Sequence, residues 1–154
     1  MVSVYVPYVN INNFLIDQFG AFEYRHYSTV LVEKLLNDYT KNDSVSFFIN
    51  VATTHFEIIV SKDKKLLLYN TFTYKTSEDF IYYILFAVEQ LKLNVEDISV
   101  VLLGEIKKQD ALFKIVYKYI RNVSFLEEKS KYSAILQIEE QVKRENFTLF
   151  KAVN

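Results

Sequence analysis

The chain has no cysteine and no tryptophan, and its 154 residues include only two glycines and one proline. Without cysteine there is no disulfide, thiolate metal site or cysteine nucleophile, a composition that fits a reducing compartment. Two glycines leave little material for a glycine-rich phosphate loop. No basic residue precedes Arg25, as a secretory signal would require, and the longest apolar run, residues 80–88, is far too short to span a bilayer. We therefore expect a cytoplasmic protein without a membrane partner.

Neither sign of charge is in excess: the chain has 18 Lys and Arg residues and 19 Asp and Glu residues, for a net charge of -1. This balance gives no electrostatic reason to bind nucleic acid. Hydrophobic residues make up 51% of the chain, and 13 Phe and 12 Tyr raise the aromatic share to 16%. Such a chain can bury a sizeable core, in one domain or two small ones.

The first 40 residues predict the order strand, helix, strand, helix. Residues 2–6 are β-branched and aromatic, and residues 10–18 place apolar side chains at helical spacing before Gly20. Residues 22–27 read as extended, and Ser28 is in a position to cap a second helix. This order matches only the later part of an α/β half-domain, so we expect residues 1–40 to be a partial first subdomain, with an exposed strand edge at residues 2–6.

From residue 44 the pattern predicts a complete α/β unit over residues 44–154. Strands are expected at 47–52, 54–60 and 66–72 as an antiparallel meander, followed by a helix that begins at Thr76 with a capping box and runs to Asn94. The apolar run 98–103 is typical of a buried parallel strand, and a ligand is expected at its carboxyl end. A helix over 109–121, a strand at 123–126, a helix over 132–145 and an extended piece at 147–153 complete the prediction.

Three strands, helix, strand, helix, strand, helix is the order of the ribonuclease-H-like fold, which also builds both halves of actin, sugar kinases and heat-shock ATPases. Several segments resemble a bacterial family of unknown function with an actin-like fold: Val4 to Asn10, Thr54 to Phe56 with Leu68 to Phe72, Glu78 to Tyr83, and Val101 to Gly104. The match is to the later portion of that family. The resemblance implies a mixed α/β sheet and a cytoplasmic setting, and it leaves the activity open.

Active members of this superfamily bind ATP and magnesium with two signatures, which the resemblance places at two points of this chain. Asn50 stands where the aspartate that organises the metal belongs, in a turn that continues through Ala52, Thr53 and Thr54. Gly104 is followed by Glu105 where a glycine pair belongs, and a carboxylate repels phosphate. We expect Asn50, Thr53, Thr54 and Gly104 to be a vestigial nucleotide site, with no cofactor, no resident metal and no catalytic residue; ATP with magnesium is the alternative.

Two other patterns carry alternative interpretations. His55 and Glu57 project from one face of a strand, as a general base and its orienting carboxylate would, but no nucleophile accompanies them and a solvated strand face explains them better. A two-metal nuclease of this fold would need an acid at Asn50.

Tyrosine is spread through almost every predicted element and suits contacts between domains or subunits as well as the boundary of an aromatic core. We therefore expect a non-catalytic module that binds a protein partner or forms a homo-oligomer. The alternative is an actin-like ATPase or phosphotransferase completed by a missing half or a second chain. A third interpretation is a dimerisation unit that pairs through the edge at Val4.

Overall fold

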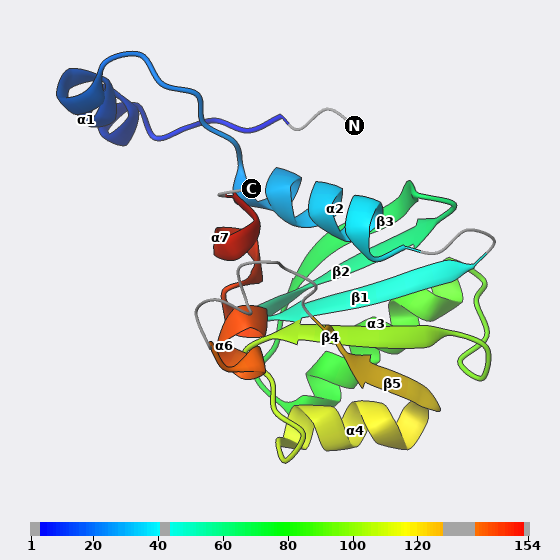
Figure 1. The fold of residues 1–154 in the computed structure, drawn as a ribbon. Helices are drawn as coiled ribbons and strands as arrows, with labels where there is room; N and C mark the ends of the chain where they lie inside the picture. Colours follow the sequence, from blue (N-terminus) through cyan, green and yellow to red (C-terminus); the bar gives the residue numbers. More distant parts are fainter. Residues whose placement is uncertain (1–3, 41–43, 128–137, 153–154) are drawn as a thin grey trace.

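Five strands form one mixed sheet at the centre of the molecule, in the order β3-β2-β1-β4-β5. The computed structural model describes residues 4–40, 44–127 and 138–152 (Figure 1). The strands are β1 (Val45–Val51), β2 (His55–Lys62), β3 (Lys65–Thr73), β4 (Ser99–Gly104) and β5 (Asn122–Phe125). β2 runs antiparallel to its two neighbours β1 and β3, whereas β4 runs parallel to β1 and β5 parallel to β4. The predicted meander and the buried parallel strand are confirmed, and so is the mixed α/β fold class.

Alternation along the central strands divides the core between the two faces of the sheet. On β1, Phe47 and Ile49 belong to one apolar cluster and Phe48 to the other. On β4, Val100 and Leu102 face the first cluster and Leu103 the second. Both faces of the sheet must therefore be covered by helices, which explains why the apolar run at β4 is almost continuous, with Ser99 as its one polar residue.

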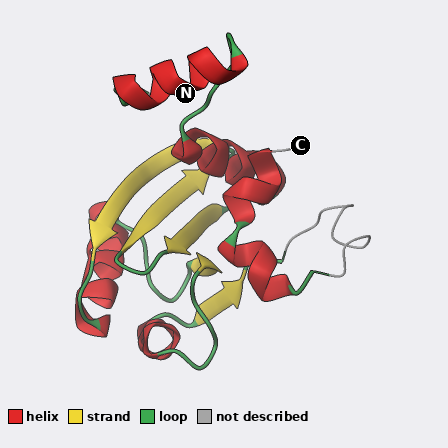
Figure 2. Ribbon diagram, turned by 90° about the vertical axis from the view of Figure 1, so that its left-hand side faces the viewer, coloured by secondary structure: helices red, strands yellow, loops and turns green. Residues whose placement is uncertain are grey.

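The first face is covered by α3 (Ser77–Gln90) and α4 (Ala111–Tyr119) (Figure 2). The Thr76 side chain accepts a hydrogen bond from the Asp79 backbone N–H, and the Asp79 carboxylate accepts one from the Thr76 N–H. This is the predicted capping box. The pKa of Asp79 is lowered by the hydrogen bonds that its carboxylate accepts from the backbone N–H of Lys75 and then from that of Thr76. Phe80 and Ile84 of α3 are completely buried against the sheet.

The second face is covered by α2 (Tyr27–Asp38) and α7 (Phe147–Ala152), with α6 (Glu140–Glu145) beside them. Two predictions are corrected here. His26, rather than Ser28, is the N-cap of α2, because its ring nitrogen accepts from the Ser28 N–H. The predicted extended piece at 147–153 is helical over its described residues, because a helix places Phe147 and Lys151 on one face, where both are buried. Of the predicted helix 132–145, residues 132–137 lie outside the described residues and 140–145 are helical.

Residues 4–24 form an arm that stands clear of the sheet and its helical layers (Figures 1 and 2). The predicted helix is present as α1 (Val9–Phe19), but none of its residues is buried. The predicted strands at 2–6 and 22–27 are wrong for the described residues, which form no strand at 4–8 or 20–26. Tyr5 packs on Tyr24 and His26, but a strand needs backbone hydrogen bonds to a neighbour, and none joins these two segments among the described residues.

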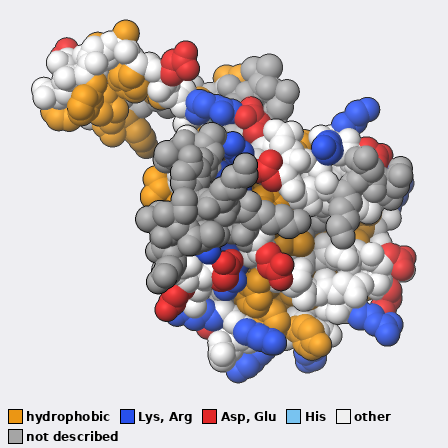
Figure 3. Space-filling view, viewed as in Figure 1, with side chains coloured by type: hydrophobic (Ala, Val, Ile, Leu, Met, Phe, Trp, Pro, Cys, Tyr) orange, Lys and Arg blue, Asp and Glu red, His pale blue; other side chains and the backbone are white. Residues whose placement is uncertain are grey.

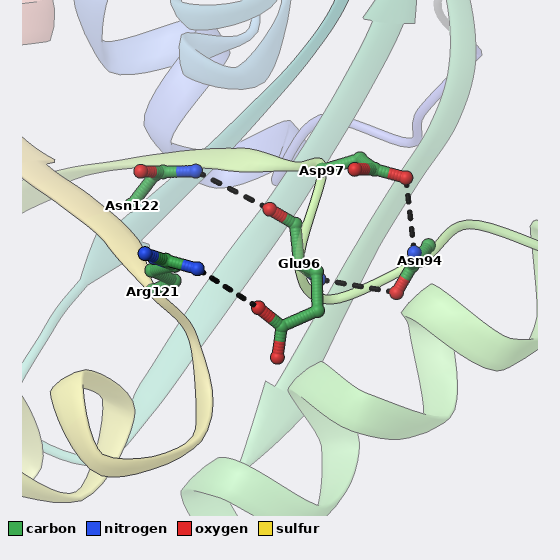
Figure 4. A network of polar contacts seen from close by, with 5 residues as sticks. All are labelled: Asn94, Glu96, Asp97, Arg121 and Asn122. Carbon is green, nitrogen blue, oxygen red and sulfur yellow. Dashed lines mark hydrogen bonds and ion pairs between the residues drawn. The ribbon is translucent and has the colours of Figure 1, made fainter.

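A set of polar contacts ties the start of β4 to the start of β5 at the amino edge of the sheet (Figure 4). Asn94 donates to Asp97 at 2.9 Å, and the Asn122 amide donates to the Glu96 carbonyl at 3.5 Å. Arg121 lies 3.8 Å from the Glu96 carboxylate. Both partners of that ion pair are exposed, so it contributes under about 1 kcal/mol and serves to position the loop.

Candidate functional site

The carboxyl ends of β1 and β4 meet at one edge of the sheet, where the sequence predicted a ligand. Val51 of β1 is the partner of Gly104 in the parallel ladder, and the Glu105 N–H donates to the Val51 carbonyl at 2.7 Å. The turn after β1 therefore lies against the turn after β4. This arrangement places Asn50, Thr53 and Gly104, three of the four residues expected to form a vestigial nucleotide site, at one edge of the sheet.

The close approach of β1 and β4 requires a glycine at position 104. Its φ is +84°, and a Cβ at this position would lie 2.1 Å from the Val51 carbonyl oxygen and 2.8 Å from the Asn50 side-chain oxygen. No other residue fits without movement of the backbone. Gly104 therefore lets the two turns touch, which is a structural reason for glycine here that needs no nucleotide.

The turn after β1 is held by a carboxylate and a phenol. The Thr53 hydroxyl donates to the Glu105 carboxylate at 2.6 Å, and the Tyr74 hydroxyl donates to the Ala52 carbonyl at 2.8 Å. Burial raises the pKa of Tyr74, and the nearby charge of Glu105 raises it further. The Thr54 hydroxyl is directed elsewhere: it lies 3.4 Å from Nδ1 of the neighbouring His55. Negative charge at this edge opposes the binding of phosphate.

A hollow of about 470 Å³ opens beside Glu105. Lys107 from the same turn and Glu145 and Asn146 from the end of α6 complete its lining. Two carboxylates and one ammonium group give it a mixed charge. Across the described parts of the chain, no three His, Cys, Asp or Glu side chains are grouped so that they could hold a metal ion.

Asn50 faces Glu57 rather than the open edge. Its amide donates to the Glu57 carboxylate at 2.8 Å across the β1–β2 pair, and the Tyr69 hydroxyl lies 3.5 Å from the other carboxylate oxygen. Glu57 is only 1% exposed, and this burial raises its pKa from 4.5 to about 7, an effect that the hydrogen bond from Tyr69 opposes. The chain thus keeps a carboxyl group inside the body that can exchange its proton near neutral pH.

The interpretation of His55 and Glu57 as residues of a solvated strand face is wrong for Glu57, because α2 covers that face. His55 remains half-exposed at the end of β2. Sequence reasoning also missed the partner Tyr69, which reaches Glu57 from β3, and the cover that α2 gives to this face. No local signal could have found them, because long-range pairing and helix packing bring them together.

The fold and this edge together define the class: a mixed α/β sheet of the actin-like ATPase fold. A protein with that fold and unknown function from Bacteroides thetaiotaomicron superposes with a TM-score of 0.73 at 22% sequence identity, over 92% of this chain and 49% of that chain. Residues 1–123 match the family described as protein of unknown function (DUF3822), and the chain belongs to that family.

No curated protein has a sequence that matches the chain. The chain spans about half the length of the solved structure that it resembles. Within the described ranges, every helix is too short or too polar to cross a membrane.

Proposed function

We propose that this protein is a non-catalytic binding module that assembles with another protein through its arm, residues 4–24. The observation that carries the proposal is the exposure of apolar side chains along this arm (Figure 3). Val6 is 91% exposed, Phe19 75% and Phe14 61%. Contiguous apolar surface of this kind marks an interaction site in a folded protein.

The extended start of the arm has the alternation of a strand that lacks a partner. Val4, Val6 and Tyr8 are exposed, whereas the intervening Tyr5 and Pro7 are half-buried against their own chain. Tyr5 lies edge-on to Tyr24, with ring centroids 6.3 Å apart. One side of this segment is thus covered and the other is open, as in a segment that adds to the sheet of another protein.

The helix of the arm also needs external support. An isolated helix of 11 residues is marginal in water, and α1 buries none of its residues in this chain. An anionic membrane is a poor support, because residues 4–24 include Asp17 and Glu23 but no Lys or Arg. A protein surface with apolar pockets and a free strand edge fits the arm better.

We infer that the partner surface is a second α/β half-domain of similar size. The solved structure with the same fold is about twice as long as the matched part, so its remaining length is available to form such a half. This half can belong to the same polypeptide or to another one. The setting that we propose is the bacterial cytoplasm, with no nucleic acid involved.

The nucleotide site has lost its function in this proposal. Asn50 donates its amide to a buried carboxylate, and Glu105 binds the hydroxyl of Thr53. The alternative is an actin-like ATPase or phosphotransferase that a second half completes, and exposed Thr53 and Thr54 at the expected turn favour it. Calorimetric titration with ATP, with and without magnesium, separates the two: saturable binding that Thr53→Ala abolishes would support the enzyme.

Site-specific photo-crosslinking in the producing cells tests the arm directly. A photoreactive phenylalanine analogue replaces Phe14 in the arm or, as the matched control, Tyr117 on α4, since both side chains are 61% exposed. We expect a crosslinked product of discrete mass from position 14 that disappears in the Val6→Asp background. The control position should give none.

Equal products from both positions, or none from position 14, would contradict the proposed function. Sedimentation of the purified chain over a range of concentrations then identifies the partner type. A monomer points to a different protein or to another part of a longer chain, and a reversible dimer points to a second copy.

A further inference from the structure

The two edges of the sheet differ in how well they are protected against pairing with another strand. β5 at one edge has only 4 residues, whereas β3 at the other edge has 9 (Figure 1). Residues 66–73 of β3 include no charged residue, no proline and no glycine. Soluble proteins usually keep an edge strand short or place charge or proline on it, because a long apolar edge pairs with other strands. The edge at β3 therefore has the character of a binding surface.

The backbone of β3 presents hydrogen-bonding groups on its outer side. The Tyr74 N–H donates to the Thr54 carbonyl, toward β2, and N–H groups alternate in direction along a strand. Alternation turns the N–H groups of Thr71 and Thr73 away from β2. In agreement, the Thr71 N–H donates to the side-chain oxygen of its neighbour Asn70 at 2.9 Å. A further strand needs only to displace that side chain to pair with this edge.

The arm of the same chain has an extended segment that matches this edge. The N–H groups of Val4, Val6 and Tyr8 make no hydrogen bond to any described residue. Pro7 has no N–H, and in an extended segment it faces the opposite lateral side from these three residues. The side that keeps all three N–H groups can therefore face β3. The side with Pro7 becomes the new outer edge, where proline is tolerated and prevents further addition.

We propose that residues 4–8 of one copy of this chain add as a further strand to the outer side of β3 in a second copy, antiparallel to it. In this register Val6 lies opposite Thr71. Val4 then lies opposite Thr73. The proposal rests on the proposed function, because it names the partner of the arm as the body of a second copy.

Aromatic side chains support this register on both faces of the sheet. Tyr8 would lie opposite Tyr69, which packs against the second apolar cluster. On the other face Tyr5 would lie opposite Phe72, whose ring stacks on that of Tyr83 with centroids 4.7 Å apart. Aromatic pairs across neighbouring strands stabilise a sheet.

Charge favours a second copy as the partner and favours the antiparallel direction. The arm includes Asp17 and Glu23 but no basic residue, whereas the turn between β2 and β3 includes Lys62, Lys64 and Lys65 with a single acid among them. In the antiparallel direction α1, which follows residue 8, lies toward this basic turn. In the parallel direction it would lie at the other end of β3, where α3 begins with two acidic residues. Complementary charge selects the first arrangement.

Disulfide trapping tests the contact, since the chain has no cysteine of its own. Two variants of the full chain, Val6→Cys and Thr71→Cys, are mixed and mildly oxidised, and an isotope label on one variant identifies the mixed dimer by mass. Opposite residues of paired strands lie about 5.5 Å apart at Cα, a separation that a disulfide bridges. We expect a mixed dimer from this pair and from Val4→Cys with Thr73→Cys.

The matched control replaces Thr71→Cys by Ser124→Cys. Ser124 is also exposed but lies on β5, at the opposite edge of the sheet. With Val6→Cys it should give at least about tenfold less mixed dimer, because a strand of this length offers little edge to pair with. Equal yields at the two edges would overturn the proposal.

Sedimentation without oxidant measures the association itself. The wild-type chain should associate reversibly, and Thr71→Pro should weaken this by at least about tenfold, since proline blocks the outer side of β3 and leaves its hydrogen bonds to β2. Thr71→Ala is the control and should associate as the wild type does. Val6→Pro makes the same test on the arm if Thr71→Pro fails to fold, because α1 and the arm bury nothing in the body.

A chain that stays monomeric at high concentration and gives no mixed dimer between the Val6 and Thr71 variants would overturn the second copy as partner. The proposed function would survive that result if position 14 still crosslinks to a protein of another mass. A mixed dimer without any crosslink at position 14 would support the contact between copies and contradict the function in cells. The two proposals therefore fail separately.

Discussion

Asn50 and Gly104 determine, at the scale of single residues, how the two turns at the site meet. Gly104 allows the turns to touch, and Asn50 directs its amide into the body toward Glu57. The buried carboxylate gains a hydrogen-bond donor by this arrangement, which reduces the free-energy cost of its burial. Both residues thus serve internal packing in this structure.

Replacement of Gly104 by alanine should destabilise the fold. The added Cβ would overlap the Val51 carbonyl oxygen, and the positive φ adds backbone strain, so we expect a loss of at least about 2 kcal/mol in the free energy of unfolding. Denaturation in urea measures it. Gly20→Ala is the control, because its φ is also positive but nothing lies within 4 Å of the added Cβ. A similar loss in both variants would show that φ alone matters.

Replacement of Glu57 by glutamine should remove a pH-dependent loss of stability. Burial holds the pKa of Glu57 near 7 in the folded chain against 4.5 when unfolded, so the folded state binds the proton more tightly. The wild type should therefore lose up to about 3 kcal/mol relative to Glu57→Gln as pH rises from 4.5 through 7. Urea titrations at several pH values measure the difference. Glu89→Gln, an exposed glutamate on α3, should leave the wild-type pH dependence unchanged.

At the scale of elements, α1 and α3 show that sequence pattern predicts a helix but that packing decides whether the helix joins the body. Both α1 and α3 have apolar residues at helical spacing, and both were predicted. α3 has a capping box and packs on the sheet, whereas α1 has neither a side-chain cap nor a buried residue. Periodicity therefore predicted the helices but not which of them belongs to the body.

The short helix α7 owes its conformation to α2 and the sheet. Phe147 is 2% exposed and packs against the second apolar cluster, while Leu149 of the same helix is 65% exposed. We expect Phe147→Ala to lower the free energy of unfolding by about 3 kcal/mol and Leu149→Ala by less than about 0.5 kcal/mol. Thermal or urea denaturation compares the two. Equal effects would mean that α7 does not pack as described.

The molecule as a whole consists of a three-layer body and an arm that shares no core with it. The body has two apolar clusters, one on each side of the sheet. The arm contacts the body at its root, where Tyr5 packs on His26 and Arg25 pairs with Glu33. A partner that orders the arm therefore need not disturb the sheet.

Hydrogen exchange should separate these two parts. Amides of α1 should exchange through local opening with little protection, because the helix is short and buries nothing, whereas amides of β1 and β2 should exchange only through global unfolding. Exchange of the purified chain, read by mass spectrometry of its peptides, measures both. Protection of α1 equal to that of β1 in a monomeric sample would contradict an independent arm.

The sequence by itself determined the elements of the body from α2 to β5, because alternation, helical periodicity and the capping residues at Thr76 and Asp79 act over a few neighbouring positions. It also placed Asn50, Thr53 and Gly104 at one edge, since parallel strands end on the same side of a sheet. Only the tertiary structure decided the rest. Strand formation at residues 4–8 depends on a neighbouring strand, the helical state of α7 depends on packing against α2, and the proton affinity of Glu57 depends on burial beneath a helix distant in sequence.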